Sequence, residues 1–140
     1  MGESKNLFEF LMGEENVNQL YILILLVVLD YITGICVAVH QKQLSSKIGF
    51  KGISLKVMIF VIISMCHVLD GYLLGKGSTI QAMSIFFYCA NEVVSILENS
   101  VAVGLPLPQK LKEVLLNFKA RKKDEESADL PQMLRLRLEV

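Results

Sequence analysis

The chain has 140 residues, of which 53% are hydrophobic and 20% are charged, and its mean hydropathy is +0.49. A soluble domain of this size needs more polar surface, since typical soluble chains are about 25% charged, so the composition favours insertion into a membrane. The 14 basic residues balance the 14 acidic ones, which argues against a nucleic-acid-binding protein.

The first apolar stretch spans residues 17–39, in which Asp30 is the one formally charged residue. A helix needs about 20 residues to cross a bilayer, so this stretch is long enough. The preceding segment, residues 1–16, contains four glutamates against a single lysine, whereas a secretory signal peptide begins with a basic leader. We therefore predict a retained transmembrane helix over residues 17–39.

Two further membrane spans are predicted, over residues 53–75 and 79–103. The first of these is interrupted by Lys56 near one end and by two ionisable residues toward the other. The last span has the lowest hydropathy because it contains two glutamates, so a buried or pore-facing position suits it best. Residues 76–78 are left as a short turn between these spans, and Pro106 stops the last one.

Lysines and arginines gather in two segments, the predicted loop 40–52 and the stretch 104–123 after the last span. Basic residues near span ends stay on the cytoplasmic side of a membrane. Two crossings separate these segments, so both can share that side. This predicts that residues 1–16 lie outside and that the carboxyl terminus lies inside. The topology and membrane-surface candidates are Lys42, Lys47, Lys51, Lys110, Lys112, Lys119, Arg121, Lys122 and Lys123.

The stretch 104–123 is also predicted to hold a basic amphipathic helix. Its lysines occupy other faces than its apolar residues, which recur at helical spacing as Leu111, Val114, Leu115 and Phe118. Such a helix suits an anionic membrane surface, but a short soluble extension that obeys the positive-inside rule explains the pattern equally well. In the tail, residues 124–140, the acidic run 124–129 predicts a linker, and the alternation over 134–138 fits a strand or a disordered tail.

Each predicted span carries polar residues on one helical face. An ionisable side chain at the centre of a membrane helix costs about 2.5–3.5 kcal/mol, so each one must be compensated. Two interpretations stay open: the polar faces line a water-filled lumen between several copies, or they make interhelical hydrogen bonds worth about 0.6 kcal/mol each. The pore-lining or interhelical candidates are Asp30, Thr33, Ser64, His67, Asp70, Asn91, Glu92, Ser95, Glu98 and Asn99.

Two pairs of small residues predict helix packing. Gly34 with Ala38 in the first span and Gly71 with Gly75 in the second have the spacing that lets membrane helices approach closely. This spacing is common by chance, so we expect it to support association rather than to define it.

Enzymatic chemistry and metal binding have little support in the sequence. The three cysteines lie in apolar runs without metal-ligand spacing, and the chain has two histidines. His67 and Asp70 lie on adjacent helical turns, so we expect them to pair with each other rather than to bind a metal. The turn over residues 75–79 lacks a glycine that a phosphate-binding loop needs. We expect neither enzymatic activity nor a cofactor.

A series of short motifs follows the predicted spans in order. They are Leu29-Asp30-Tyr31-Ile32-Thr33-Gly34, Ser45-Ser46-Lys47 before Gly49-Phe50-Lys51-Gly52-Ile53 and Lys56, Leu69-Asp70, Asn91-Glu92 with Ser95-Ile96, and Glu98-Asn99 before Gly104-Leu105-Pro106-Leu107-Pro108. Together, over roughly residues 20–118, they resemble the phage-lysis and toxin-secretion holins of Gram-positive bacteria and their prophages. Each motif is weak alone, but their order and spacing in so short a chain are specific.

The resemblance implies that copies of the chain accumulate in the bacterial cytoplasmic membrane as homo-oligomers and form pores. An endolysin, or a toxin without a signal peptide, would leave the cell through them, and host lysis would follow. Polar faces that are buried in small assemblies would then turn to a shared lumen at high density. Two other classes stay open: a membrane scaffold or accessory subunit without a pore, and a narrow ion or proton channel.

Overall fold

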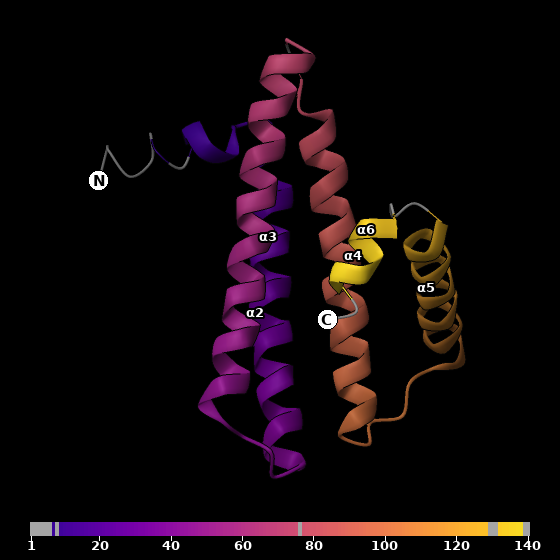
Figure 1. The fold of residues 1–140 in the computed structure, drawn as a ribbon. Coiled ribbons are helices and arrows are strands. Elements are labelled where there is room, and N and C mark those ends of the chain that lie inside the picture. The colour runs from indigo at the N-terminus through magenta and orange to yellow at the C-terminus, as the bar shows by residue number, and fades with distance from the viewer. Residues whose placement is uncertain (1–6, 8, 76, 129–131, 139–140) are drawn as a thin grey trace. The chain divides into compact units, whose positions relative to one another are not determined.

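The structure of the chain, a computed structural model, describes residues 7, 9–75, 77–128 and 132–138. The described residues form the helices α2 (Val17–His40), α3 (Ser46–Leu73), α4 (Thr79–Ala102), α5 (Gln109–Ala128) and α6 (Gln132–Leu138), drawn in Figure 1. Residues 7 and 9–12 are also helical. The described part of the chain contains no strand, which confirms the predicted all-α class there.

Three of these helices, α2, α3 and α4, are long and apolar enough to cross a membrane, as predicted. α2 and α4 begin at the predicted residues and end at His40 and Ala102, next to the predicted ends at 39 and 103. α4 stops because Gly104 adopts a left-handed conformation, with φ +91°, and Pro106 follows.

α3 differs from the predicted second span at both ends. It begins at Ser46, inside the predicted loop 40–52, and ends at Leu73 rather than at residue 75. Gly75 has φ +67°, a left-handed conformation in which a helix cannot continue. The helix extends beyond the apolar core at its start because each further residue adds a backbone hydrogen bond to a turn that already exists. The connection between α2 and α3 is therefore shorter than predicted.

α2 packs mainly against α4, and α4 also packs against α3, whereas α2 and α3 share few contacts. Figure 1 shows the three helices running alongside one another. Their apolar core is small and consists of Leu20, Leu23, Ile63 and Ile85, which are buried together. Partly buried apolar residues, among them Val27 and Phe60, pack against this core, and polar contacts between the helices add to it.

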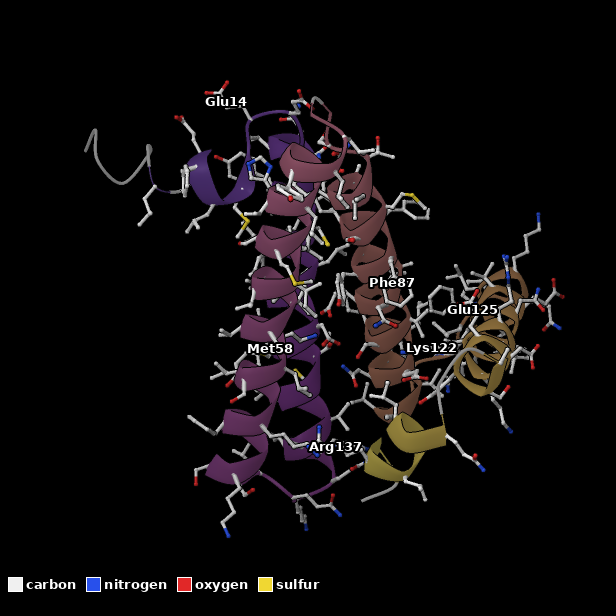
Figure 2. The ribbon with its side chains drawn as sticks, turned by 45° about the horizontal axis from the view of Figure 1, so that its top comes forward. Glu14, Met58, Phe87, Lys122, Glu125 and Arg137 are labelled. Atoms are coloured by element: carbon white, nitrogen blue, oxygen red, sulfur yellow. The ribbon has the colours of Figure 1, made fainter. Side chains whose placement is uncertain are left out.

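The outer surface of the three helices is apolar. Over residues 20–39, 57–69 and 80–101, every exposed residue is aliphatic, aromatic, Met or Cys. Met58 on α3 and Phe87 on α4, both labelled in Figure 2, are two of them. Every polar residue in these stretches is buried or half-buried. Such a surface suits the hydrocarbon core of a bilayer, where no water satisfies polar groups.

α5 and α6 belong to a second compact unit, residues 106–140. α5 continues through residues 124–128, so the predicted linker is wrong for these residues, whose Glu and Ala favour a helix. α6 is helical where a strand or a disordered tail is predicted over 134–138. An alternating segment needs a partner strand, and the described residues offer none, so the helix preference of Leu and Arg prevails.

Candidate functional site

One ammonium group joins the three membrane helices. Nζ of Lys56 in α3 donates a hydrogen bond to Oδ2 of Asp30 in α2, at 2.6 Å, and another to Oε2 of Glu92 in α4. Both acids are buried, whereas the Lys56 side chain is 19% exposed. Each acid lies about midway along its helix, so these bonds form at the depth where an ionised side chain is most costly in a membrane.

Two polar side chains extend this arrangement between α2 and α4. Nδ2 of Asn99 donates to Oδ1 of Asp30 at 3.2 Å and to Oγ1 of Thr33 at 3.0 Å. The Thr33 hydroxyl in turn donates to the backbone carbonyl of Asp30 at 3.0 Å. Both carboxylate oxygens of Asp30 are thus bonded. We call these five residues the ionic cluster: Asp30, Thr33, Lys56, Glu92 and Asn99.

The charges of the ionic cluster make it a strong but demanding contact. Two carboxylates share one ammonium, so the cluster has a formal charge of −1 when all three groups are ionised. Removal of one partner from a buried ion pair typically costs about 3–5 kcal/mol, because the other charge is left without compensation. In a chain whose helices share a small apolar core, the cluster is therefore a principal attachment of α3 to its neighbours.

A cavity of about 210 Å³ lies beside the ionic cluster, between α2 and the first turns of α3. Lys56 and Asp30 line it, together with Ser95 of α4. The predicted pair Gly34 and Ala38 also lines this cavity, and a Cβ at Gly34 would meet Nδ2 of Asn99 at 3.9 Å, which is ordinary contact. These small residues thus border a space between α2 and α3 instead of closing it.

A second polar network lies at the end of the bundle where α3 ends and α4 begins. The carboxylate of Asp70 in α3 accepts hydrogen bonds from the backbone N–H groups of Ile80 and Gln81, at 2.9 and 2.8 Å. These are donors of the first turn of α4, which the N-cap residue Ser78 does not satisfy with its side chain. Asp70 therefore caps α4 from the neighbouring helix.

The segment before α2 is held to the same end. Gln81 is fully buried, its Nε2 donates to the carbonyl of Met12 at 2.5 Å, and its Oε1 accepts from Nδ2 of Asn16 at 2.9 Å. Gly13 packs so closely on His67 that an added Cβ would lie 2.6 Å from Cε1 of the imidazole, and the φ of Gly13 is +72°. Glycine is therefore required at this position.

The expected pairing of His67 with Asp70 is not found among the described residues. Asp70 binds the start of α4 instead, and Nδ1 of His67 is buried with no hydrogen-bond partner in the described part of the chain. Helical spacing alone predicted the pair, but the short turn after α3 brings free N–H groups to Asp70, and these bind a carboxylate well.

The structure brings some predicted polar residues into the ionic cluster and places others elsewhere. Ser64 donates to the carbonyl of Phe60 within α3, and Asn91 and Glu98 are half-buried on α4. A Cβ at Gly71 or at Gly75 would meet no described atom within 4 Å, so this pair packs against nothing described within one chain. Its contact with another copy stays a prediction. The basic topology candidates are all exposed.

Sequence reasoning missed the role of Lys56, which it treated as an interruption of an apolar span and as part of a family motif, but not as the partner of the buried acids. The available signal was its charge, because a lysine inside a membrane helix needs an acid on a neighbouring helix. Gln81 and Asn16 were also missed, because both lie at the ends of predicted spans, where a polar residue needs no partner within the membrane. Among the described residues, no group of His, Cys, Asp and Glu could hold a metal ion.

Comparison with known proteins adds a family. Residues 6–120 match the sequence profile of the bacteriophage holin family. An uncharacterized protein of Listeria innocua is 41% identical over 119 residues, which make up 85% of this chain and 84% of that protein. A 14.9 kDa protein of Clostridium perfringens is 35% identical over 116 residues, or 83% and 87% of the two chains. The probable holin of Bacillus phage phi105 is 29% identical over 99 residues, 71% of each chain. No solved structure matches the chain.

Proposed function

Because the chain belongs to the bacteriophage holin family, we propose that it assembles with its own copies into lesions of the bacterial cytoplasmic membrane. These lesions let a cytoplasmic endolysin reach the cell wall, and the host then lyses. The observation that carries the proposal is the family match over residues 6–120, which covers all three candidate membrane spans.

The structure supports this proposal through the distribution of its polar groups. Exposed residues over 20–39, 57–69 and 80–101 are apolar, so separate copies dissolve in lipid. The ionic cluster keeps three ionisable groups of the spans, Asp30, Lys56 and Glu92, inside the bundle. A protein of this kind accumulates harmlessly and still holds polar side chains that can meet water in an assembly.

The test is timed expression in a bacterium with and without a cytoplasmic endolysin, with culture density and membrane potential followed together. We expect the potential to collapse in both strains and the density to fall only where the endolysin is present. An unrelated three-span membrane protein at equal abundance is the control, and it should leave the potential intact.

The outcomes separate the other classes of function. Loss of potential without release of the endolysin indicates a narrow ion channel and contradicts the holin proposal. Neither loss of potential nor release indicates a scaffold or accessory subunit. Release of the endolysin through its own signal would mimic a holin, so the endolysin must be one that stays in the cytoplasm when expressed alone.

A further inference from the structure

We call the described arrangement of α2, α3 and α4 the closed chain. Over residues 20–39, 57–69 and 80–101, it exposes no polar surface that could line a water-filled opening. Over the central parts of α2, α3 and α4, the exposed residues are apolar, and the ionic cluster faces inward. Water in contact with such a surface gains no hydrogen bonds, so a hydrated lesion made of closed chains is unfavourable. Lesion formation therefore requires the helices to rearrange and turn these polar groups toward water.

The contacts between helices show where the bundle is weakest. α2 and α4 pack along each other, whereas α2 and α3 share few contacts and leave a cavity of about 210 Å³ between them. Next to this cavity, Lys56 links α3 to Asp30 and Glu92. The first half of α3, residues 46–59, carries Lys56 and is called the Lys56 half. Before the apolar core begins at Ile59, this half is held to α2 by the Lys56–Asp30 bond and by contact of the Tyr31 ring with Gly49 and Gly52.

The other half of α3 is attached differently. Asp70 is fully buried and bonds two backbone N–H groups of α4, so the end of α3 next to the turn stays with α4. In that turn, Gly75 and Gly77 have φ of +67° and +116°, conformations that glycine adopts without strain. A fastened end beside a glycine-containing turn is the geometry of a hinge.

We propose that the bonds of Lys56 to Asp30 and Glu92 hold the chain closed and break before a lesion forms. The Lys56 half of α3 then swings away from α2 about the α3–α4 turn. The swing exposes Asp30, Glu92 and Asn99 to a shared aqueous space, and hydration of these groups replaces the bonds that Lys56 made. The inference rests on the proposed holin function, which it deepens by naming the step that converts the closed chain.

A reversible cross-link between α2 and α3 tests the swing. A Cβ at Gly52 would lie 3.9 Å from Cε2 of Tyr31, one helical turn from Lys56. Tyr31→Cys and Gly52→Cys are introduced into a chain whose Cys36, Cys66 and Cys89 are replaced by Ala. The full chain is placed in liposomes that contain a fluorescent dextran, and a short bis-methanethiosulfonate reagent bridges the two thiols. We expect bridging to slow dextran release by about tenfold or more, and a thiol reductant to restore it.

A matched cross-link at the hinge end is the control. Sγ of Cys66 in α3 lies 3.2 Å from Oγ of Ser84 in α4. In a chain that keeps Cys66 but has Cys36 and Cys89 replaced by Ala, Ser84→Cys can therefore be bridged to Cys66 near the turn that joins these helices. Bridging there should change dextran release by less than about twofold, because the Lys56 half stays free to move. If the α2–α3 bridge leaves release as fast as the unbridged protein, the proposed swing is wrong.

A second readout separates the swing from the holin function itself. Ser95→Cys, placed in the same cysteine-free chain, puts a thiol beside the cavity. Its reaction rate with a water-soluble thiol reagent should rise about tenfold as the chain is packed more densely in liposomes. A rate that does not depend on density overturns the swing even if dextran escapes. A rate that rises without dextran release supports the swing and contradicts the holin proposal.

Discussion

Asn16, just before α2, donates a hydrogen bond of 2.9 Å to the side-chain oxygen of Gln81 in α4, and both residues are buried. The two positions are far apart in the sequence, so this bond joins the amino-terminal segment to the start of α4. Gln81 also donates to the Met12 carbonyl, so this one side chain bonds the segment at two points.

Replacement of this amide should destabilise the bundle. Gln81→Leu takes this donor from the Met12 carbonyl and leaves the Asn16 amide with the carbonyl of Ser78 alone. A buried unsatisfied polar group costs about 1–3 kcal/mol. The measurement is unfolding of the detergent-solubilised protein by SDS, followed by circular dichroism. Met83→Leu on the exposed face of α4 is the control and should have little effect. If Gln81→Leu unfolds at the same SDS fraction as the control, the amide contributes no stability.

The charge of Lys56 should matter more than its size. Lys56→Met leaves Asp30 and Glu92 buried without a cation and should cost about 3–5 kcal/mol of stability. Addition of Asp30→Asn and Glu92→Gln to the same chain should recover most of this loss, because no uncompensated charge remains. SDS unfolding and the amount of protein retained in membranes measure both variants. A triple variant that is less stable than Lys56→Met alone would contradict this account.

Two features explain how far the sequence could predict the spans and where it failed. The ends of α2 and α4 follow from long apolar runs with turn residues beyond them, a signal that belongs to each segment alone. The partners of Lys56 do not follow from any one segment, because Asp30 and Glu92 become its neighbours only when the three helices pack with a particular rotation about their axes. The sequence therefore shows each acid within an apolar span but not its bond to Lys56.

The same limit explains the predictions that were wrong. Asp70 and His67 share a helical face, so spacing paired them, but the start of α4 reaches Asp70 through a turn whose geometry the sequence does not reveal. In α6 an alternating pattern suggested a strand, although no strand among the described residues could accept it. In both cases a neighbouring segment decides the outcome, and local pattern cannot supply it.

Glu92→Gln should bring lesion formation forward without preventing membrane insertion. The amide still accepts a hydrogen bond from Lys56, but the attraction between opposite charges at α4 is lost. Lys56 therefore leaves α4 more easily, and the proposed swing of α3 needs less free energy. The time from induction to collapse of membrane potential is measured at equal protein abundance. Glu15→Gln, an exposed residue before α2 and outside both the spans and α5, is the charge-matched control and should not change this time. A delayed collapse for Glu92→Gln would show that Glu92 promotes lesions and does not restrain them.

The predicted orientation can be tested with single thiols. Basic residues flank α3 at its start and follow α4, so both regions should be cytoplasmic and the segment before α2 should be outside. In a chain without its native cysteines, Glu14→Cys should react with a membrane-impermeant thiol reagent in intact cells, and Ser46→Cys should react only after the cells are opened. The reverse pattern would require the opposite topology.

The basic residues of α5 should set when lesions form. Each basic residue near an anionic membrane surface contributes about 1 kcal/mol of attraction, and equal charges on neighbouring copies repel one another. In the neutralised variant, four exposed residues become glutamine: Lys119, Arg121, Lys122 and Lys123. This variant weakens both the attraction to the membrane surface and the repulsion between copies. The copies should therefore gather sooner, and the membrane potential should collapse earlier after induction.

Protein abundance must be matched in that experiment, because a change in expression also shifts the time of collapse. A second variant, with Glu113, Glu125 and Glu126 replaced by Gln, raises the net positive charge of the same helix and should delay the collapse. Opposite shifts in the two variants would tie the timing to charge, since both leave the apolar residues of α5 intact. If the neutralised variant collapses the potential late or at the usual time, these basic residues act as orientation signals alone.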